Sequence, residues 1–331
     1  MTGRPLPGEF ELIERFFAPL AASAPGAIGL RDDAALIDLP PGHQLVVTAD
    51  ALVAGVHFRD DDPADLVARK ALRVNVSDLA AKGARPYAYF LTVAFSPSVD
   101  GAWVERFAAG LAADQAEYGL ALMGGDTTAT PGPTTLSITA LGLVRDGLFL
   151  RRAGAAAGDQ VFVSGTVGDG ALGLRVLDGR LNGLSEANRR FLIERYQLPR
   201  PRPALGLALA AERLASAALD VSDGVAADLG HLAEASNLGA VIEAARLPLS
   251  PAARAAVTAD PSLWGLIVSG GDDYEIMFTA APDKVGAVAG LARGLDLALT
   301  PIGRMEPGKG VRVLEPAGAV MALERTGYRH F

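Results

Sequence analysis

The sequence predicts an α/β (α+β) protein of two domains, and three observations support this fold class. A length of 331 residues favours two domains over one. Half of the residues are hydrophobic, which is enough to fill a core in each domain. Strand-like and helix-like patterns follow one another along the chain. A short basic, Gly/Ala-rich stretch after Asp146-Gly147 marks the expected boundary, giving domains of residues 1–147 and 148–331.

The first half contains three predicted helices and five predicted strands. Helices are expected where apolar residues recur at helical spacing, over residues 8–20, 63–83 and 103–118. Strands are expected where short apolar or β-rich runs end at turns, over residues 34–37, 44–50, 87–95, 120–123 and 134–144.

The second half opens with a predicted strand over 159–164 and the glycine-rich segment Gly165–Gly170. This segment has neither the G-x-x-x-x-G-K-[ST] pattern of a P-loop nor a clean G-x-G-x-x-G pattern, so we expect a flexible turn there. A Pro/Arg turn precedes a predicted helix over 204–217. The apolar run Ala218–Val221 then predicts a strand, and a helix follows it through Ser236.

Composition excludes several classes of function. The formal charge is 30 − 38 = −8 and the isoelectric point is near 5.1, which argues against a nucleic-acid-binding face but not against a nucleotide held through Mg²⁺. Because the chain has no cysteine, disulfides, thiolate nucleophiles and zinc–thiolate sites are excluded, and a cytoplasmic setting fits. We expect neither a signal peptide nor a membrane span, since charges interrupt every apolar stretch.

The segment Leu120–Thr128 carries the clearest sign of a ligand site. Its apolar run ends in Gly124-Gly125, which we interpret as a turn that a ligand can approach, with Asp126 at the strand end. The alternative is a tight turn in which Asp126 only caps the next element. Repetition favours the ligand site, because similar aspartates stand at the edges of other apolar segments: Asp33, Asp50, Asp78, Asp220 and Asp223.

Several of these residues also have an ordinary explanation. Asp33 and its neighbour Asp32 could both face water before a strand begins. Asp78 lies late in a predicted helix, where the helix dipole disfavours it, so either a cation or Lys82 should compensate.

Two further positions keep two interpretations each, and a third feature has one. Ser222 or Asp223 could be a helix N-cap, or the two carboxylates of Asp220 and Asp223 could converge on one cation. His57 could contact a phosphate or be an ordinary hydrogen-bonded histidine. The acidic run 60–62 is expected to be a solvated turn, and we do not assign it to a metal.

This set of side chains suits phosphoryl transfer. The candidate ligands are oxygens without cysteine or clustered histidines, which fits Mg²⁺ and not zinc or copper. Several Mg²⁺ ions on a nucleotide imply phosphoryl transfer, where positioning and charge neutralisation supply most of the catalysis. A phosphate acceptor is already anionic and would need no general base. The residues alone therefore indicate a Mg²⁺-dependent, ATP-using enzyme and do not name its acceptor.

The motifs, taken in order, resemble those of the thiamine-monophosphate kinase family over nearly the whole chain. Each motif is short, but the ordered set is highly specific. They are Gly8-Glu9-Phe10, Asp32-Asp33-Ala34-Ala35, Thr48-Ala49-Asp50, Gly55-Val56-His57-Phe58, Asn75-Val76-Ser77-Asp78-Leu79-Ala80-Ala81, Gly124-Gly125-Asp126-Thr127-Thr128, Asp220-Val221-Ser222-Asp223-Gly224, Ser269-Gly270-Gly271-Asp272-Asp273-Tyr274-Glu275 and Gly327-Tyr328-Arg329-His330-Phe331.

The resemblance implies a two-domain fold like that of aminoimidazole ribonucleotide synthetase, in which N-terminal sheets of two subunits pair and the acidic site lies at the domain and dimer junction. It implies direct transfer of the ATP γ-phosphoryl group to the phosphate of thiamine monophosphate, with no covalent nucleophile or general base. The Mg²⁺ ligands that it implies are Asp33, Thr48, Asp50, Asp78, Asp126, Asp220 and Asp223. Its implied ATP contacts are Gly125, Asp126, Arg152 and Ser222, and its substrate contacts are His57, Asp272 and Tyr328.

Three positions depart from the family pattern. Arg31 stands where the family usually has glycine, which affects the turn at Asp33. Ala49 stands where a hydroxyl is frequent, so that any metal contact there must come from the backbone. Asp272 replaces the usual glutamate and has a shorter reach toward the substrate.

Two rival functions follow from the same sequence. One is another ATP-dependent synthetase of the superfamily, although the absence of cysteine disfavours selenophosphate synthesis. The other is a nucleotide-binding or scaffold protein that has lost catalysis, which retention of the acidic residues disfavours.

Overall fold

The chain folds into two compact units, which are described separately. The computed structural model describes residues 6–315, 318–323 and 327–328. Unit 1 consists of Met1–Leu79 and Ala84–Gly147, and unit 2 of Ala80–Gly83 and Leu148–Phe331. Within the described ranges, no helix combines the length and the apolar character needed to cross a membrane.

Unit 1 is built around a four-stranded sheet in the order β1-β4-β2-β3. Only β2 and β3 run parallel, and the other neighbours are antiparallel. The strands are β1 (His43–Val53), β2 (Arg85–Phe95), β3 (Leu122–Ala129) and β4 (Thr135–Arg145). The helices are α1 (Glu9–Leu12), η1 (Ile13–Phe17), η2 (Ala18–Ala21), η3 (Pro25–Leu30), α2 (Ala64–Ala81) and α3 (Gly101–Tyr118).

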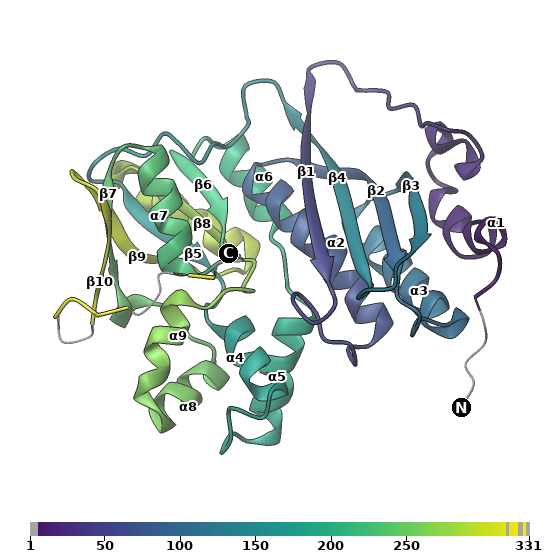
Figure 1. Ribbon diagram of the computed structural model, residues 1–331. Helices are drawn as coiled ribbons and strands as arrows, with labels where there is room; N and C mark the ends of the chain where they lie inside the picture. Colours follow the sequence, from purple (N-terminus) through teal and green to yellow (C-terminus); the bar gives the residue numbers. More distant parts are fainter. Residues whose placement is uncertain (1–5, 316–317, 324–326, 329–331) are drawn as a thin grey trace. The chain divides into compact units, whose positions relative to one another are not determined.

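The two faces of this sheet differ in burial. Helices α2 and α3 lie against one face (Figure 1), where Leu136, Ile138 and Ala140 of β4 are fully buried. On the opposite face, the segment around η2 and η3 packs over one end through Ala21 and Ala27. The rest of that face is open, and its β1 positions are exposed: Val47, Ala49 and Ala51.

A buried ion pair joins α2 to α3 behind the sheet. The side chain of Asp114 is fully buried, and both of its carboxylate oxygens accept from Arg73, with Nε–Oδ2 at 2.7 Å and Nη2–Oδ1 at 3.0 Å. Arg69 donates to Asp114 as well, at 2.7 Å. Because a bidentate arginine matches carboxylate geometry, the pair is satisfied without water.

Unit 2 has a six-stranded sheet as its middle layer, in the order β10-β7-β9-β5-β8-β6. Its strands are β5 (Gln160–Ser164), β6 (Ala217–Asp220), β7 (Gly239–Glu243), β8 (Ile276–Ala280), β9 (Leu299–Glu306) and β10 (Gly310–Leu314). Its helices are α4 (Asp169–Leu177), α5 (Glu186–Gln197), α6 (Pro203–Ala211), α7 (Val225–Ala235), α8 (Pro251–Ala259), α9 (Trp264–Ser269) and α10 (Val285–Leu295), with short 3₁₀ turns at Ala244–Arg246, Pro261–Leu263 and Pro282–Lys284.

Alternation along the strands divides the core of unit 2 into two clusters. Val161 and Val163 of β5 pack in a cluster with α4, α7, α8 and α9. Phe162, between them, faces the other cluster with α6 and α10, and stacks on Phe278 of β8 at a ring-centroid distance of 5.2 Å. Figure 1 shows these two helical layers around the strands.

The long elements of the first half agree with the predicted ones. Four local predictions are wrong, three in the first half and one in the second. The predicted helix over 8–20 is a short α-helix followed by π and 3₁₀ turns, and Phe10 in it is 84% exposed. No strand forms at 34–37, because Leu36 donates its amide to Gly26 and folds this segment back on itself. Helix α6 ends at Ala211, six residues early, where Arg213 adopts a left-handed φ of 53° before β6.

The fourth correction concerns Gly124-Gly125, which does not form a turn. Both glycines lie inside β3, so Asp126 is a mid-strand residue. Gly125 has φ +151°, and a Cβ there would lie 1.7 Å from the carbonyl oxygen of Leu91 on β2. Glycine is therefore required by the close approach of two strands beside a β-bulge, and not by a chain reversal.

We expect the Arg73–Asp114 pair to matter more for stability than its exposed neighbour. Asp114→Ala should lower the free energy of unfolding by about 3–5 kcal/mol, because it leaves a buried guanidinium charge without its carboxylate. Glu117, 47% exposed and also bonded to Arg73, is the matched control; Glu117→Ala should cost about 1 kcal/mol or less. Urea unfolding followed by circular dichroism measures both, and equal losses would contradict this account.

Candidate functional site

The candidate residues of unit 1 fall into two groups on opposite faces of the sheet. Thr48 and Asp50 alternate with exposed positions along β1 and face the helices. The Thr48 hydroxyl donates to the carboxylate of Asp78 on α2 at 2.5 Å. This hydrogen bond joins the β1 edge of the sheet to the late part of α2, where a carboxylate otherwise opposes the helix dipole.

Asp126 lies on the other face, at the other edge of the sheet. It pairs in register with the exposed Thr92 of β2, and Gly124, two residues earlier, faces the ring of Phe90. Strands β1 and β3 are separated by three strand spacings, or about 14 Å. One metal ion therefore cannot be shared by Asp126 and Asp78 of the same unit.

The remaining candidates of unit 1 lie outside regular strands. Asp33 is exposed after η3, where Asp32 accepts its backbone amide at 2.8 Å. Arg31 pairs with Glu14 at 3.1 Å, and both side chains are largely exposed. His57 follows β1 in a tight turn, where its Nδ1 accepts from the amide of Val53 at 3.1 Å.

Four candidates of unit 2 meet at the turn Ser222–Gly224, which links β6 to α7. The Ser222 carbonyl accepts from the amide of Asp272 at 2.9 Å, and the Asp223 carbonyl accepts from the amide of Tyr328 at 3.1 Å. Asp220 is the last residue of β6, directly before this turn. Backbone hydrogen bonds thus bring together the metal candidate Asp223, the ATP candidate Ser222 and two substrate candidates, Asp272 and Tyr328. Arg152 is exposed in the segment before β5, next to Arg151, whose carbonyl accepts from the amide of Ala218 in β6 at 2.8 Å.

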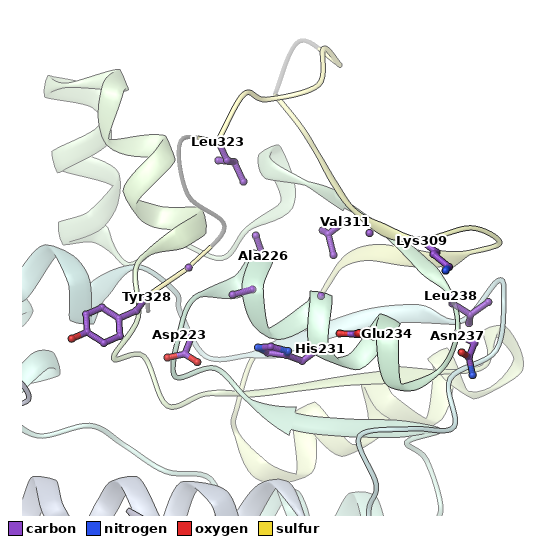
Figure 2. Close-up of a pocket in the computed structure, with 14 residues that line it drawn as sticks. Asp223, Ala226, His231, Glu234, Asn237, Leu238, Lys309, Val311, Leu323 and Tyr328 are labelled. Atoms are coloured by element: carbon purple, nitrogen blue, oxygen red, sulfur yellow. The ribbon is translucent and has the colours of Figure 1, made fainter. Parts of the chain in front are cut away.

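A cavity of about 670 Å³ opens beside this turn and runs along α7. Figure 2 shows Asp223 and Tyr328 at one end, and Asn237 and Lys309 at the other. His231 projects from α7 between them. The volume is that of ordinary small-molecule sites.

Two buried aspartates that the sequence did not single out anchor the loops around the turn. Asp228 on α7 accepts from the amides of Asp223 and Gly224, at 3.0 and 3.1 Å. Burial, with the nearby charge of Asp223, raises the pKa of Asp228 to about 7. Asp273 accepts from Gly168 and Gly170, at 2.6 and 3.2 Å, and burial raises its pKa well above the usual value.

A third buried carboxylate, Glu275, completes this support. It accepts from Arg195 at 3.0 Å, from Arg202 at 2.6 and 2.7 Å, and from the Ser164 hydroxyl at 2.6 Å. A signal for all three was available, because an acidic residue next to or within an apolar run must find internal partners. In the glycine-rich segment, residues 165–168 are irregular and Asp169 and Gly170 already belong to α4, so the predicted turn covers only the first four residues. Asp273 accepts from two of its amides.

Asp126 and Asp223 differ from the buried aspartates in their partners. Over the part of the chain that the structure describes, no arginine, lysine or histidine forms an ion pair with Asp126 or Asp223. In the same residues, no group of three His, Cys, Asp or Glu side chains lies close enough to hold a metal ion. The candidate ligands offer oxygen atoms only, which fits Mg²⁺.

The chain matches two domain families along its length. Residues 31–144 match the AIR synthase related protein, N-terminal domain, and residues 156–315 match the AIR synthase related protein, C-terminal domain. The predicted two-domain α/β fold class is therefore confirmed. E. coli HypE has the same fold at 22% identity and a TM-score of 0.75, over 95% of this chain and 96% of that one.

Relatives named thiamine-monophosphate kinase match nearly the whole chain. The protein of Caulobacter vibrioides is 43% identical over 98% of this chain and 91% of its own length, and that of Escherichia coli K12 is 42% identical over 98% of both. The Stenotrophomonas maltophilia K279a structure is 45% identical with a TM-score of 0.83, over 92% of this chain and 96% of that one. AaThiL, solved with AMPPCP and TMP, is 31% identical with a TM-score of 0.77, over 98% and 97%. The chain therefore belongs to the thiamine-monophosphate kinase family.

Proposed function

We propose that this chain transfers the γ-phosphoryl group of ATP to the phosphate of thiamine monophosphate, giving thiamine diphosphate and ADP. The observation that carries the proposal is the full-length match to thiamine-monophosphate kinases, one of which binds AMPPCP and TMP together. The acceptor phosphate is already anionic, so the chain needs no general base. We place this reaction in the cytoplasm, because ATP is its co-substrate.

Mg²⁺ is the metal that the carboxylates suit. Buried carboxylates in this chain, such as Asp114 and Glu275, are matched by arginines, whereas Asp126 and Asp223 have no basic partner among the described residues. Bound Mg²⁺ would neutralise charge on the transferring phosphoryl group. The residues proposed to hold the ions are Asp33, Thr48, Asp50, Asp78, Asp126, Asp220 and Asp223.

The nucleotide and substrate contacts follow from side-chain chemistry. Arg152 is exposed and offers a guanidinium to the ATP phosphates, and Ser222 offers a hydroxyl beside Asp223. The backbone of β3 at Gly125, next to Asp126, is proposed to contact the ATP phosphates. The side chains proposed to contact thiamine monophosphate are His57, Asp272 and Tyr328, and the last of these lines the cavity along α7.

We propose that two chains form a homodimer through the open face of the unit 1 sheet. This face carries apolar side chains in the exposed part of β1, among them Val47 at 57% exposure. Asp126 lies on the same face, about 14 Å from β1. A site that uses both Asp78 and Asp126 would then take one from each subunit.

The first test is product formation. With ATP, Mg²⁺ and thiamine monophosphate, the protein should give equal amounts of thiamine diphosphate and ADP, and chelation of Mg²⁺ should abolish both. Free thiamine as a parallel acceptor should give no product. ADP without thiamine diphosphate would instead indicate another acceptor within the superfamily, and ATP binding without turnover would indicate a scaffold.

The metal assignment predicts large losses at two of the proposed ligands. Asp126→Asn and Asp223→Asn should each lower kcat/KM by about 100-fold or more, since an amide replaces an anionic ligand of the metal. Asp61→Asn is the matched control, because Asp61 is exposed, pairs with Arg59 and is not among the proposed ligands. Wild-type rates in both test variants, with circular dichroism unchanged, would refute the assignment.

Mixing two inactive variants tests the shared site. Asp78→Asn and Asp126→Asn homodimers should both be inactive, because each lacks one ligand in both sites. If the subunits exchange at random, the mixture should recover about one quarter of the wild-type activity, because half of the dimers are mixed and have one intact site. A mixture that stays inactive after exchange, shown by tagged-subunit co-purification, would place both residues in one chain's site.

A further inference from the structure

The turn Ser222–Gly224 connects the candidate residues of unit 2. Besides its bonds to Asp272 and Tyr328, it continues from Val221, whose carbonyl accepts from Tyr274 and whose amide donates to Glu275, both at 2.8 Å. These hydrogen bonds run through the backbone and do not depend on the identity of the side chains. A shift of the turn therefore moves all the candidates together.

The conformation of this turn depends on one side chain, that of Asp228. A single oxygen, Oδ2, accepts from the amides of both Asp223 and Gly224, at 3.0 and 3.1 Å. Asp228 is only 4% exposed. The residue at the N-cap of α7 is Gly224, which has φ 118° and no side chain, so Asp228 reaches back from the fourth helical position to accept these amides.

We propose that Asp228 is a positioning residue: its buried carboxylate fixes the turn Ser222–Gly224 and thereby places Asp223, Asp272 and Tyr328 for Mg²⁺ and substrate. The inference rests on the proposed function, which assigns those three residues to the site. Asp228 acts through the backbone, since its Oδ2 accepts from two amides of the turn.

The hydrogen bonds of Asp228 and Asp273 also affect where a phosphate could bind. Helix N-termini commonly hold phosphates through their amides, but Asp228 already occupies the amides that precede α7. Asp273 does the same before α4, where it accepts from Gly168 and Gly170. Both helix starts are thus filled by internal carboxylates. A phosphate bound beside either of these two helices would then be held by side chains and metal ions, which require a rigid and correctly placed Asp223.

The physical cost of losing Asp228 lies in these two amides. Without the Asp228 carboxylate these amides lose their acceptor, and the turn must move to satisfy them. Asparagine is the informative replacement, because its carbonyl oxygen has the shape and acceptor capacity of Oδ2 but no charge. Alanine removes the acceptor altogether.

The experiment compares Asp228→Ala and Asp228→Asn in the full-length protein. In Asp228→Ala, the Mg²⁺ concentration at half-maximal rate should rise on the order of tenfold, as for other residues that orient metal ligands. The KM for thiamine monophosphate should rise with it. Asp228→Asn should stay within about threefold of wild type in both, because the acceptor is retained.

A matched control separates positioning from stability. Asp100 caps α3 by accepting from the amide of Trp103 at 2.8 Å. It is not among the residues proposed to contact Mg²⁺, ATP or thiamine monophosphate. Asp100→Ala should lower the unfolding temperature, as Asp228→Ala does, but leave the Mg²⁺ dependence unchanged. All rates are measured per folded molecule, well below each variant's unfolding temperature.

Two results would overturn the inference. One is a folded Asp228→Ala enzyme with wild-type Mg²⁺ dependence and KM. The other is an Asp228→Asn enzyme as impaired as Asp228→Ala, which would mean that charge and not acceptor geometry matters. Calorimetry of Mg²⁺ and a non-hydrolysable ATP analogue tests the same point without an acceptor. If wild type fails to phosphorylate thiamine monophosphate but binds the analogue, only the proposed function fails.

Discussion

Burying a carboxylate is the constraint on which much of this structure depends. A carboxylate that leaves water must be satisfied from within the protein, and the chain does so in two ways. Asp114 and Glu275 are matched by arginines, which join helices or hold a loop against a strand. Asp228 and Asp273 are matched by backbone amides at the starts of α7 and α4. Each buried acid thus determines the position of a neighbouring segment.

The candidate ligands are less buried than these acids, and Asp33 and Asp126 are exposed. The arginines that match Asp114 and Glu275 are bonded to those internal acids, and among the described residues no basic side chain pairs with Asp126 or Asp223. To neutralise bound phosphates beside these aspartates, the proposed enzyme would need cations from solution. Ligands that offer only oxygen atoms suit Mg²⁺. The overall charge of −8 agrees with the proposed arrangement, in which charge compensation would come from the metal and not from a basic surface.

Sheet geometry imposes a second constraint, which concerns assembly. In a four-stranded sheet, residues on opposite edges and opposite faces cannot meet. Thr48 and Asp78 lie together at the β1 edge, while Asp126 lies on the open face at the β3 edge. An apolar open face beside a candidate ligand is what a subunit interface requires. Dimerisation and catalysis would then depend on the same surface.

The sequence by itself determined the family and the long elements, and it predicted Mg²⁺ as the metal. Family motifs are local strings of residues, and helices such as α2 and α3 follow from apolar periodicity, so neither needs knowledge of distant contacts. Tertiary structure alone decided that Gly124-Gly125 stays within a strand, because the cause is the backbone of β2 at Leu91. It also decided the part played by Asp228, which in sequence is one more acid in a helix. Its importance arises only when the chain folds back and two amides converge on its oxygen.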